Sequence, residues 1–493
     1  MRRDFRGAVL PSILLSGVVL AIVWGALAFG AVYPWAYTPL AIGGAAVGLA
    51  AFTIKLGNPF SLRPLTLGCL AIAAAISLQL MPLSPRVLGA VSPSTDRFLS
   101  RYDLSYQMSS RELAGDGVRA AARWPISLTP SATVLGLSLF LALAIFMLGT
   151  VRIVSGTGAL AAARALVIFG VMLAVFAIGQ YVLSGGETYL LKIYGFWQPQ
   201  YRGSPFGPFV NRNHFAGWML MVLPLAAAAA YGAAVSERHD GLHQVVSWLS
   251  RSPVAARMQL MTLAATVMGL SILLSQSRSG MLALAAEAAL LGGFIVRRQA
   301  SRRGRVIAVT VIAAGVLVVA AWAGLDRLMA RAATVAGDLP TGGGRIGAWG
   351  DTVHIIRDFP VTGTGLNTFG TAMVLYQTGN RDLHFQEAHN DYLQLAAEGG
   401  LLVGIPVAIL VWIFVRAVKQ RFAEAPAEGS TYWLRIGAVI ALLGIAVQAF
   451  VEFSLQMPGN TALFAVVAAI ALHRSPNLRT HSRSAATSPS LTD

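Results

Sequence analysis

Long apolar runs, separated by short polar segments, follow one another along almost the whole chain. A helix that crosses the hydrocarbon core of a bilayer needs about 20 mostly apolar residues. The pattern therefore predicts an all-α polytopic membrane protein with about twelve transmembrane helices. The runs are 9–30, 36–54, 65–81, 131–151, 159–183, 214–234, 258–275, 280–296, 306–325, 396–415, 436–453 and 460–473, the last being the shortest.

The basic residues predict how these helices are oriented. The first run follows Arg2, Arg3 and Arg6 and lacks a small-residue cleavage site, so we expect a retained span with a cytoplasmic N-terminus. An even number of spans places the C-terminus on the same side. The cytoplasmic segments then carry roughly twice the density of Lys and Arg of the outer segments, as the positive-inside rule expects. We expect the arginine-rich turn 297–305 to anchor this orientation.

The segments between the runs divide the chain into six parts. Three outer segments are too long to be simple turns, and long loops on a compact helical body are usually functional. In the largest, Trp349, Val353 and Ile356 stand at helical spacing and predict amphipathic helices near the outer membrane surface. The parts are helices 1–81, an outer segment 82–130, helices 131–325 with a second outer segment 184–213, the large outer loop 326–395, helices 396–473 and a disordered cytoplasmic tail 474–493.

Composition separates the chain from soluble proteins. Of 493 residues, 56% are hydrophobic and 12% are charged, whereas soluble domains have about 45–50% apolar and about 25% charged residues. The net charge of +16 could indicate a nucleic-acid partner, but the basic residues lie between apolar runs and form no patch, so we exclude one. Cys69, the only cysteine, can form no internal disulfide, and we expect it to pack inside a helix.

Two arginines stand where an anionic ligand could bind. Arg278 lies in a very short turn between two runs, so it must find water, a partner or an anion. A guanidinium binds phosphate oxygens bidentately, which makes Arg278 a candidate phosphate clamp; an arginine that reaches from the interface into water is the structural alternative. Arg345 follows three glycines at the start of a predicted helix, where an anion is favoured. No Gly-Lys-Ser/Thr follows, so we reject a nucleotide loop.

His389 is the candidate acid or base. It lies in a polar cluster just before the run 396–415, with Glu387 and Asp391 at hand to orient it. A solvated helix cap is the structural alternative. A zinc site is not supported, because His384 and His389 are five residues apart without a His-Glu-x-x-His pattern or a cysteine ligand.

Further polar residues lie at the same outer level or inside a span. Asn211, Arg212 and Asn213 precede the run 214–234, where interface anchoring is the structural alternative to a ligand contact. Glu287 lies within a span, where a carboxylate is expected to be functional or to pair with Arg164.

Taken together, these segments resemble the O-antigen ligase and polymerase superfamily of bacterial envelope glycan transferases. The resemblance covers roughly residues 200–415 and rests on the order and common sidedness of several motifs. They are residues 206–213, the turn Ser277-Arg278-Ser279-Gly280, Arg345-x-x-x-Trp349 with the following 360–369, and His389-Asn390-x-x-Leu393.

The resemblance implies a GT-C-like architecture in the bacterial inner membrane. It implies transfer of a glycan from undecaprenyl diphosphate to an acceptor hydroxyl at the periplasmic face, with inversion and without nucleotide, cofactor or metal. The acceptor can be lipid A core, another glycan or a protein. The long segment 82–130 departs from short ligases, and on that ground we favour polymerase or exopolysaccharide assembly.

The residues suggest the same chemistry on their own. A lipid diphosphate that leaves gathers negative charge, which pre-placed cations stabilise, and the acceptor hydroxyl must lose a proton to a base. We expect a catalytic group of His389, Glu387 and Asp391, a diphosphate-binding group of Arg278, Arg345 and Arg212, and substrate contacts from Asn211, Asn213, Trp349 and Asn390.

Two other classes of function stay open at this point. A secondary transporter or a flippase of lipid-linked glycans predicts charged residues at the membrane midplane and broken helices in corresponding halves. A non-catalytic membrane scaffold predicts that Arg278, Arg345 and His389 do not converge.

Overall fold

The computed structural model describes residues 2–54, 61–112, 123–186, 191–198, 204–237, 247–248, 250–298, 344–379, 384–424 and 429–474. In these ranges every regular element is a helix, and β interactions are limited to isolated bridges. The helices are α1 (Arg2–Leu27), α2 (Pro34–Thr53), α3 (Arg63–Gln79), α4 (Pro85–Val91), α5 (Pro93–Tyr102), α6 (Leu104–Glu112), α7 (Pro130–Thr157), α8 (Ala159–Leu183), α9 (Arg212–Val235), α11 (Pro253–Leu274), α12 (Arg278–Arg298), α15 (Gly344–Asp358), α16 (Phe369–Tyr376), α17 (Asp391–Glu424), α18 (Ser430–Gln448) and α19 (Pro458–Leu472), with short 3-10 helices η1 (Phe29–Ala31) and η4 (Ser454–Gln456).

The described helices confirm an all-α polytopic membrane protein. Nine of them are long and apolar enough to cross a membrane: α1, α2, α7, α8, α9, α11, α12, α17 and α18. Two more apolar helices, α3 and α19, are shorter. Eleven of the twelve predicted runs thus coincide with helices. The predicted span 306–325, most of the arginine-rich turn and the tail from 475 lie outside the described residues, so the number of twelve spans stays a prediction.

The boundaries of α17 and α18 differ from those of the predicted spans 396–415 and 436–453. Helix α18 ends at Gln448, although the apolar run continues to residue 453, because Phe450, Val451 and Phe453 keep the hydropathy high after the helix has ended. Helix α17 extends beyond the predicted span 396–415 at both ends and bends at Gly400, whose φ of 54° and ψ of −158° are not helical. Hydropathy reports burial in lipid, so it does not detect where the backbone turns.

A helix is present where Trp349, Val353 and Ile356 predict one, but these residues do not form its buried face. The buried residues of α15 are Ala348, Asp351, Thr352 and Ile355, whereas Val353 is 36% exposed. The polar residues are accommodated by hydrogen bonds: Thr352 Oγ1 donates to the Ala348 oxygen at 2.6 Å, and the Asp351 carboxylate accepts from Thr378. Satisfied polar groups can be buried, and a hydrophobicity pattern misses them.

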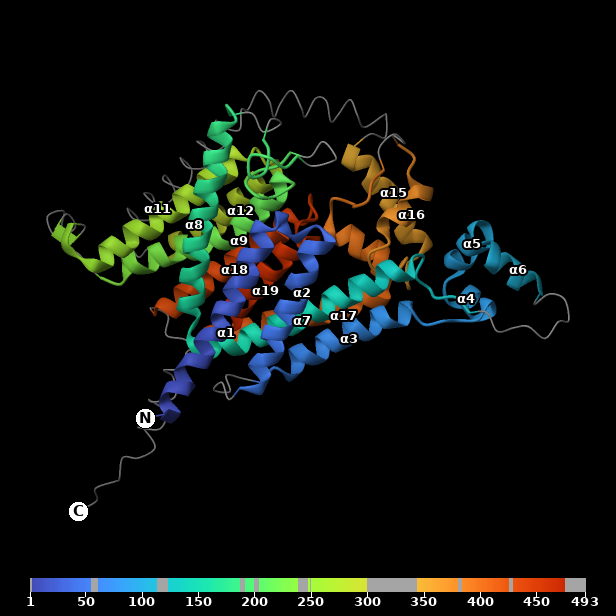
Figure 1. Cartoon of the computed structure of the whole chain (residues 1–493), viewed down its shortest axis with the longest axis horizontal. Coiled ribbons are helices and arrows are strands. Elements are labelled where there is room, and N and C mark those ends of the chain that lie inside the picture. Colours follow the sequence, from blue (N-terminus) through green and yellow to red (C-terminus); the bar gives the residue numbers. More distant parts are fainter. Residues whose placement is uncertain are drawn as a thin grey trace, which may run out of the picture.

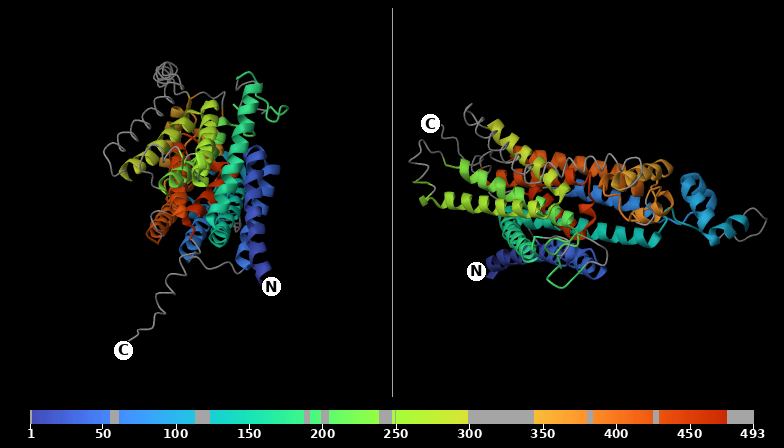
Figure 2. Two further views of the ribbon diagram at one scale, coloured as in Figure 1. Left: turned by 90° about the vertical axis from the view of Figure 1, so that its left-hand side faces the viewer. Right: turned by 90° about the horizontal axis from the view of Figure 1, so that it is seen from above.

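The long helices lie side by side in an elongated bundle, as Figure 1 and Figure 2 show. Helix α9 is central, because it packs against α8, α11, α12, α18 and α19 and more than half of its apolar segment is buried. Small residues permit the closest approaches: Gly48 of α2 and Gly149 of α7 leave no room for a Cβ atom between the helices. Close packing through small residues is the usual way in which membrane helices associate.

Several helix ends meet at one end of this bundle, next to the turn that precedes α16 (Figure 1). Gln79, the last residue of α3, is fully buried, and its side chain donates to the oxygens of Thr362 and Glu398, both at 2.8 Å, and accepts from Leu366 N at 3.1 Å. It thereby ties α3 to the turn before α16 and to α17. Helices α4, α5 and α6 extend from the same end (Figure 1).

Candidate functional site

A buried carboxylate, Glu452, organises the charged residues at this end of the bundle. Glu452 follows α18 and has no exposed side-chain surface. Its Oε1 accepts a hydrogen bond from Asn213 Nδ2 at 2.6 Å and forms an ion pair with Arg345 Nη2. Arg345 Nη1 also donates to the Val451 oxygen at 2.7 Å. One carboxylate therefore joins the start of α9, the start of α15 and the end of α18.

His389 faces the second oxygen of this carboxylate. The distance from His389 Nδ1 to Glu452 Oε2 is 3.5 Å, and no other hydrogen-bond partner of either atom lies among the described residues. The His389 side chain is 25% exposed while Nδ1 is buried, so its exposed part lies on the rest of the ring, which carries Nε2. Phe453 packs edge-to-face against both His389 and His214, with ring centroids 4.8 and 4.7 Å apart. Nε2 is thus the nitrogen that a ligand can reach.

The turn that carries Arg278 is joined to the same cluster. Ser277 Oγ donates to Asn213 Oδ1 at 2.7 Å, and Asn213 in turn contacts Glu452. Gln448 Nε2 donates to the Asn213 oxygen at 3.0 Å and lies 3.4 Å from Ser279 Oγ. Arg278 is exposed at the first position of α12, between these two anchored serines. The backbone at Arg278 is therefore fixed from both sides while its side chain is at the surface.

A second network holds the two carboxylates that flank His389. Gln394 Nε2 donates to Glu387 Oε2 at 2.5 Å and to Gln456 Oε1 at 2.9 Å, and Gln456 Nε2 donates to Asp391 Oδ1 at 2.9 Å. Gln394 Oε1 accepts from Ala388 N at 2.9 Å. Glu387 and Asp391 are thus bound to glutamines, and the carboxylate nearest to His389 is Glu452 instead.

The pKa values of Glu387 and Glu452, which both lie outside the membrane-spanning helices, are shifted in opposite directions. Burial raises the pKa of Glu387 to about 8, against the hydrogen bond from Gln394, and the nearby carboxylates of Glu398 and Asp391 raise it further. Burial acts in the same direction on Glu452, but the contact with His389 and the charge of Arg345 outweigh it and hold the pKa of Glu452 below its ordinary value. Near neutral pH, Glu452 is charged and Glu387 is largely protonated.

Several predicted ligand-binding residues have structural contacts. Asn211 caps α9, because its Oδ1 accepts from Asn213 N at 2.9 Å. Asn390 caps α17 and accepts from the backbone N atoms of residues 392 and 393, both at 3.0 Å. Trp349 Nε1 donates to the Ala388 oxygen at 2.9 Å and so supports the residue before His389. Arg212 is half-buried at the first position of α9.

The predicted residues do not form one cluster but two adjoining ones. Arg345, His389 and Asn213 meet at Glu452, and Arg278 adjoins them through Ser277. Glu387 and Asp391 belong to the glutamine network. Within the described residues, no group of three or more His, Cys, Asp and Glu side chains is arranged to hold a metal ion.

Glu452 and Gln448 contact the site residues but are not among those that the sequence predicts. Both lie at the end of the run 436–453, where the hydropathy stays high and predicts a continuous span. The signal that could have found Glu452 is an acidic residue at the outer end of a span, one residue before Phe453, on the side that carries the other polar groups.

The sequence leaves open whether Glu287 pairs with Arg164, and in the structure the two side chains do not pair. Arg164 is exposed on α8, whereas Glu287 is 2% exposed on α12 and neither of its carboxylate oxygens has a hydrogen-bond partner among the described residues. Helix α18 passes it at Gly444, where a Cβ atom would lie 1.9 Å from Glu287 Oε1. The acid thus lies inside the bundle, apart from the two clusters.

The central part of the chain matches a known protein family. Residues 263–407 match the family model described as O-antigen ligase. A comparison with curated proteins gives no match. The matched region contains Arg278, Arg345 and His389, whereas Asn213 and Glu452 lie outside it. Over residues 263–407, the chain is therefore similar to the O-antigen ligase family, which confirms the resemblance that the sequence motifs of this region indicate.

Proposed function

We propose that the protein transfers a glycan from undecaprenyl diphosphate to an acceptor hydroxyl at the periplasmic face of the bacterial inner membrane. The observation that carries this proposal is the meeting of Arg345 and His389 at the buried carboxylate of Glu452, next to the anchored turn of Arg278. A lipid-linked donor needs a site at one end of a membrane bundle that combines cations with a base, and this cluster has both.

The arginines would bind the diphosphate of the donor. Arg278 is exposed on a fixed backbone, so its guanidinium lies where phosphate oxygens can reach it. Arg345 uses two of its nitrogens for Glu452 and Val451, but a guanidinium has five N–H donors, and its side chain is 40% exposed. Arg212 lies at the start of α9, next to Asn213.

His389 would act as the base. Glu452 faces Nδ1 and favours the tautomer in which Nδ1 carries the proton, which leaves Nε2 to accept the proton of the acceptor hydroxyl. The hydroxyl oxygen attacks the anomeric carbon as its proton moves to Nε2. The bond from that carbon to the diphosphate oxygen breaks, and the electron pair stays on the lipid diphosphate, whose charge the arginines stabilise.

The experiment that tests the function is transfer by the purified full-length protein in detergent. The donor is an undecaprenyl-diphosphate oligosaccharide without added metal, offered with and without lipid A core. A ladder of longer lipid-linked chains would identify a polymerase, and a single shift of the added acceptor would identify a ligase. A variant with His389→Ala should lose at least about a hundredfold in turnover while it still binds the donor.

A transporter or flippase of lipid-linked glycans is the second candidate, and Glu287 is the observation that favours it. A carboxylate inside a membrane bundle is expected to be functional. The other polar clusters, however, lie at one end of the bundle and not along its length. Movement of the donor across reconstituted vesicles, with no transfer to any acceptor, would overturn the transferase in favour of the transporter.

A further inference from the structure

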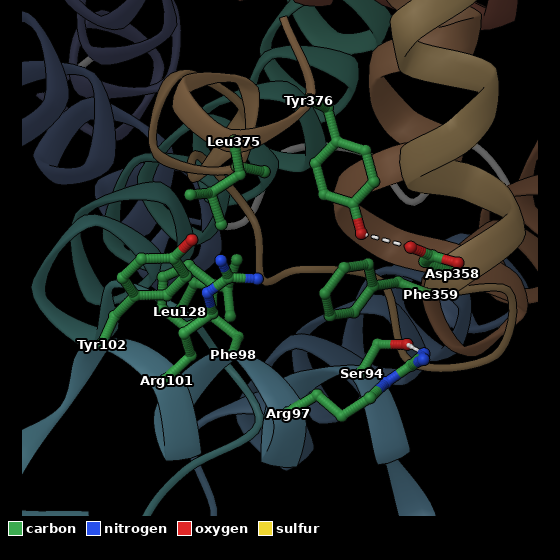
Figure 3. A pocket seen from close by; sticks show the side chains of 11 residues that line it. Ser94, Arg97, Phe98, Arg101, Tyr102, Leu128, Asp358, Phe359, Leu375 and Tyr376 are labelled. Atoms are coloured by element: carbon green, nitrogen blue, oxygen red, sulfur yellow. Dashed lines mark hydrogen bonds between the residues drawn. The ribbon is translucent and has the colours of Figure 1, made fainter.

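A cavity of about 220 Å³ lies between the segment 82–130 and the large loop, away from the cluster at Glu452. One wall is α5, which contributes Arg97, Phe98, Arg101 and Tyr102. The opposite wall comes from the end of α15 and from α16, with Phe359 and Tyr376 (Figure 3). The two walls are far apart in the sequence, so the cavity exists only when the outer segment is folded against the loop.

The side chains of this cavity combine aromatic rings with arginines. Phe98, Tyr102 and Tyr376 offer apolar surface of the kind against which the C–H face of a sugar ring can pack, whereas Phe359 is only 3% exposed. Arg97 and Arg101 are one helical turn apart and both line the cavity. The combination suits a ring-shaped ligand with an anionic group.

Charge in the cavity favours an anion over a cation. The lining contains two arginines and one acid, Asp358. Asp358 Oδ2 already accepts a hydrogen bond from the Tyr376 hydroxyl at 2.5 Å, and Arg97 Nη2 donates to Ser94 Oγ at 2.8 Å (Figure 3). Each guanidinium keeps further N–H donors, and an arginine fork matches a carboxylate or phosphate group.

The distance from the Glu452 cluster shows which part of a ligand could lie here. Arg345 stands at the start of α15 and the cavity at its end. Asp358 lies thirteen positions after Arg345 in α15, which is about 20 Å along a helix that rises 1.5 Å per residue. A sugar that reacts at His389 cannot fill the cavity at the same time, so the occupant is a remote unit of a chain.

We propose that this cavity, between α5 and α16, binds an acidic sugar unit of the glycan chain at a distance from the reacting end. The proposal rests on the function proposed above and deepens it, because it assigns the outer segment 82–130 a part in holding the polymer. Its consequence is that long acidic chains are held better than short or neutral ones.

The test is binding of a defined probe to the purified full-length protein in non-ionic detergent. The probe is a fluorescently labelled galacturonic acid oligomer, and its methyl-esterified form is the neutral counterpart. The wild type should bind the acidic oligomer at least about tenfold more tightly than the neutral one, and the double variant R97Q/R101Q should lose that preference. Arg86→Gln, an exposed arginine on the neighbouring helix α4 outside the cavity, is the matched control and should bind as the wild type does.

Several outcomes would overturn the proposal. They are equal binding of the acidic and neutral oligomers, unchanged binding by R97Q/R101Q, or an equal loss with Arg86→Gln. Displacement of the oligomer by phosphatidylglycerol at lower concentration than by free galacturonate would identify a lipid headgroup site instead. Tyr376→Phe, which removes only the hydroxyl that contacts Asp358, keeps the test informative if the double variant does not fold, and should weaken oligomer binding.

Transfer measurements separate this proposal from the proposed function. With a short neutral donor, R97Q/R101Q should turn over at the wild-type rate, whereas with a long acidic chain its KM should rise at least about tenfold. If the KM for the donor rises, the cavity binds the donor chain, and if the KM for the acceptor rises, it binds the acceptor chain. If the wild type does not transfer glycan even from the short donor, the proposed function is refuted. If the wild type is active but the KM of the variant is unchanged, only the proposed role of the cavity is refuted.

Discussion

Glu452 controls the arrangement of the charged side chains at the site. It contacts Arg345, Asn213 and His389 from a fully buried position, so the starts of α15 and α9 and the segment before α17 depend on one carboxylate. Removing one partner of a buried pair leaves the other charge uncompensated, which costs more than the pair itself contributes. The residue acts through its neighbours and positions them.

We predict that Glu452→Gln lowers turnover ten- to a hundredfold. Glutamine keeps the shape but neither holds Arg345 by charge nor stabilises a protonated His389. The measurement is transfer at saturating donor, with kcat and KM determined separately; kcat should fall more than KM changes. Glu424→Gln is the matched control, because Glu424 is also paired with an arginine, Arg421, at the other end of α17. Equal activity of the two variants would show that Glu452 does not position the site.

The raised pKa of Glu387 predicts how the stability of the protein depends on pH. Its pKa is about 8 in the folded protein, mainly through burial, against an ordinary value of 4.5. The folded state therefore holds a proton that the unfolded chain has lost, and stability falls as the pH rises from about 5 to about 8, by at most about 1.4 kcal/mol per pH unit. Thermal unfolding of Glu387→Gln in detergent should show a flatter dependence over this range.

The control for this pH effect is Asp103, whose pKa is shifted in the opposite direction. The hydrogen bond from Ser105 is the main cause that lowers the pKa of Asp103. Its contribution to stability is present above the ordinary pKa and is lost only in acid. Asp103→Asn should thus leave the slope between pH 5 and 8 unchanged. A Glu387→Gln variant with the wild-type slope would contradict the assignment.

At the scale of the elements, hydropathy predicts the spans well and the site poorly. Helices occur at all eleven runs that the described residues cover, because burial in lipid demands long apolar segments. The same window extended a span through Glu452, since Phe450 and Phe453 beside it are apolar. Arg278, Arg345 and His389 could be selected because their neighbours in sequence are unusual. Their partners could not, because Asn213 and Glu452 are 239 residues apart and meet only in the fold.

The tight turn before α16 predicts that a side chain at Gly363 destabilises the protein. Gly363 has a φ of 64°, and a Cβ atom there would lie 2.1 Å from the backbone oxygen of Glu398. Backbone cannot move away as a side-chain end can, so Gly363→Ala should destabilise the protein by more than about 2 kcal/mol. Gly350→Ala is the matched control: Gly350 is helical in α15, and a Cβ atom there meets nothing within 4 Å. Thermal unfolding should separate the two variants, and equal midpoints would show that the turn does not fit as tightly as described.

At the scale of the whole molecule, the helix ends that carry the polar clusters lie together, as expected if they share one side of the membrane. The alternation of twelve spans puts the end of α3, the start of α9, the turn at Arg278, the start of α17 and the end of α18 on one side of the membrane. The hydrogen bonds of Gln79, Asn213, Ser277 and Asp391 join these ends to one another. The grouping agrees with the predicted alternation, and the distribution of basic residues predicts which side of the membrane it faces.

Labelling of single cysteines tests that side directly. Cys69 is buried and is the only cysteine, so Cys69→Ala gives a background without reactive thiols. Phe196 is 74% exposed before the start of α9, and Ser236 is exposed just after its end; the 24 residues of α9 span about 36 Å. In spheroplasts, a membrane-impermeant maleimide should label Phe196→Cys at once and Ser236→Cys only after permeabilisation. The reverse order would place His389 and the arginines in the cytoplasm, where a donor delivered to the periplasmic face could not reach them.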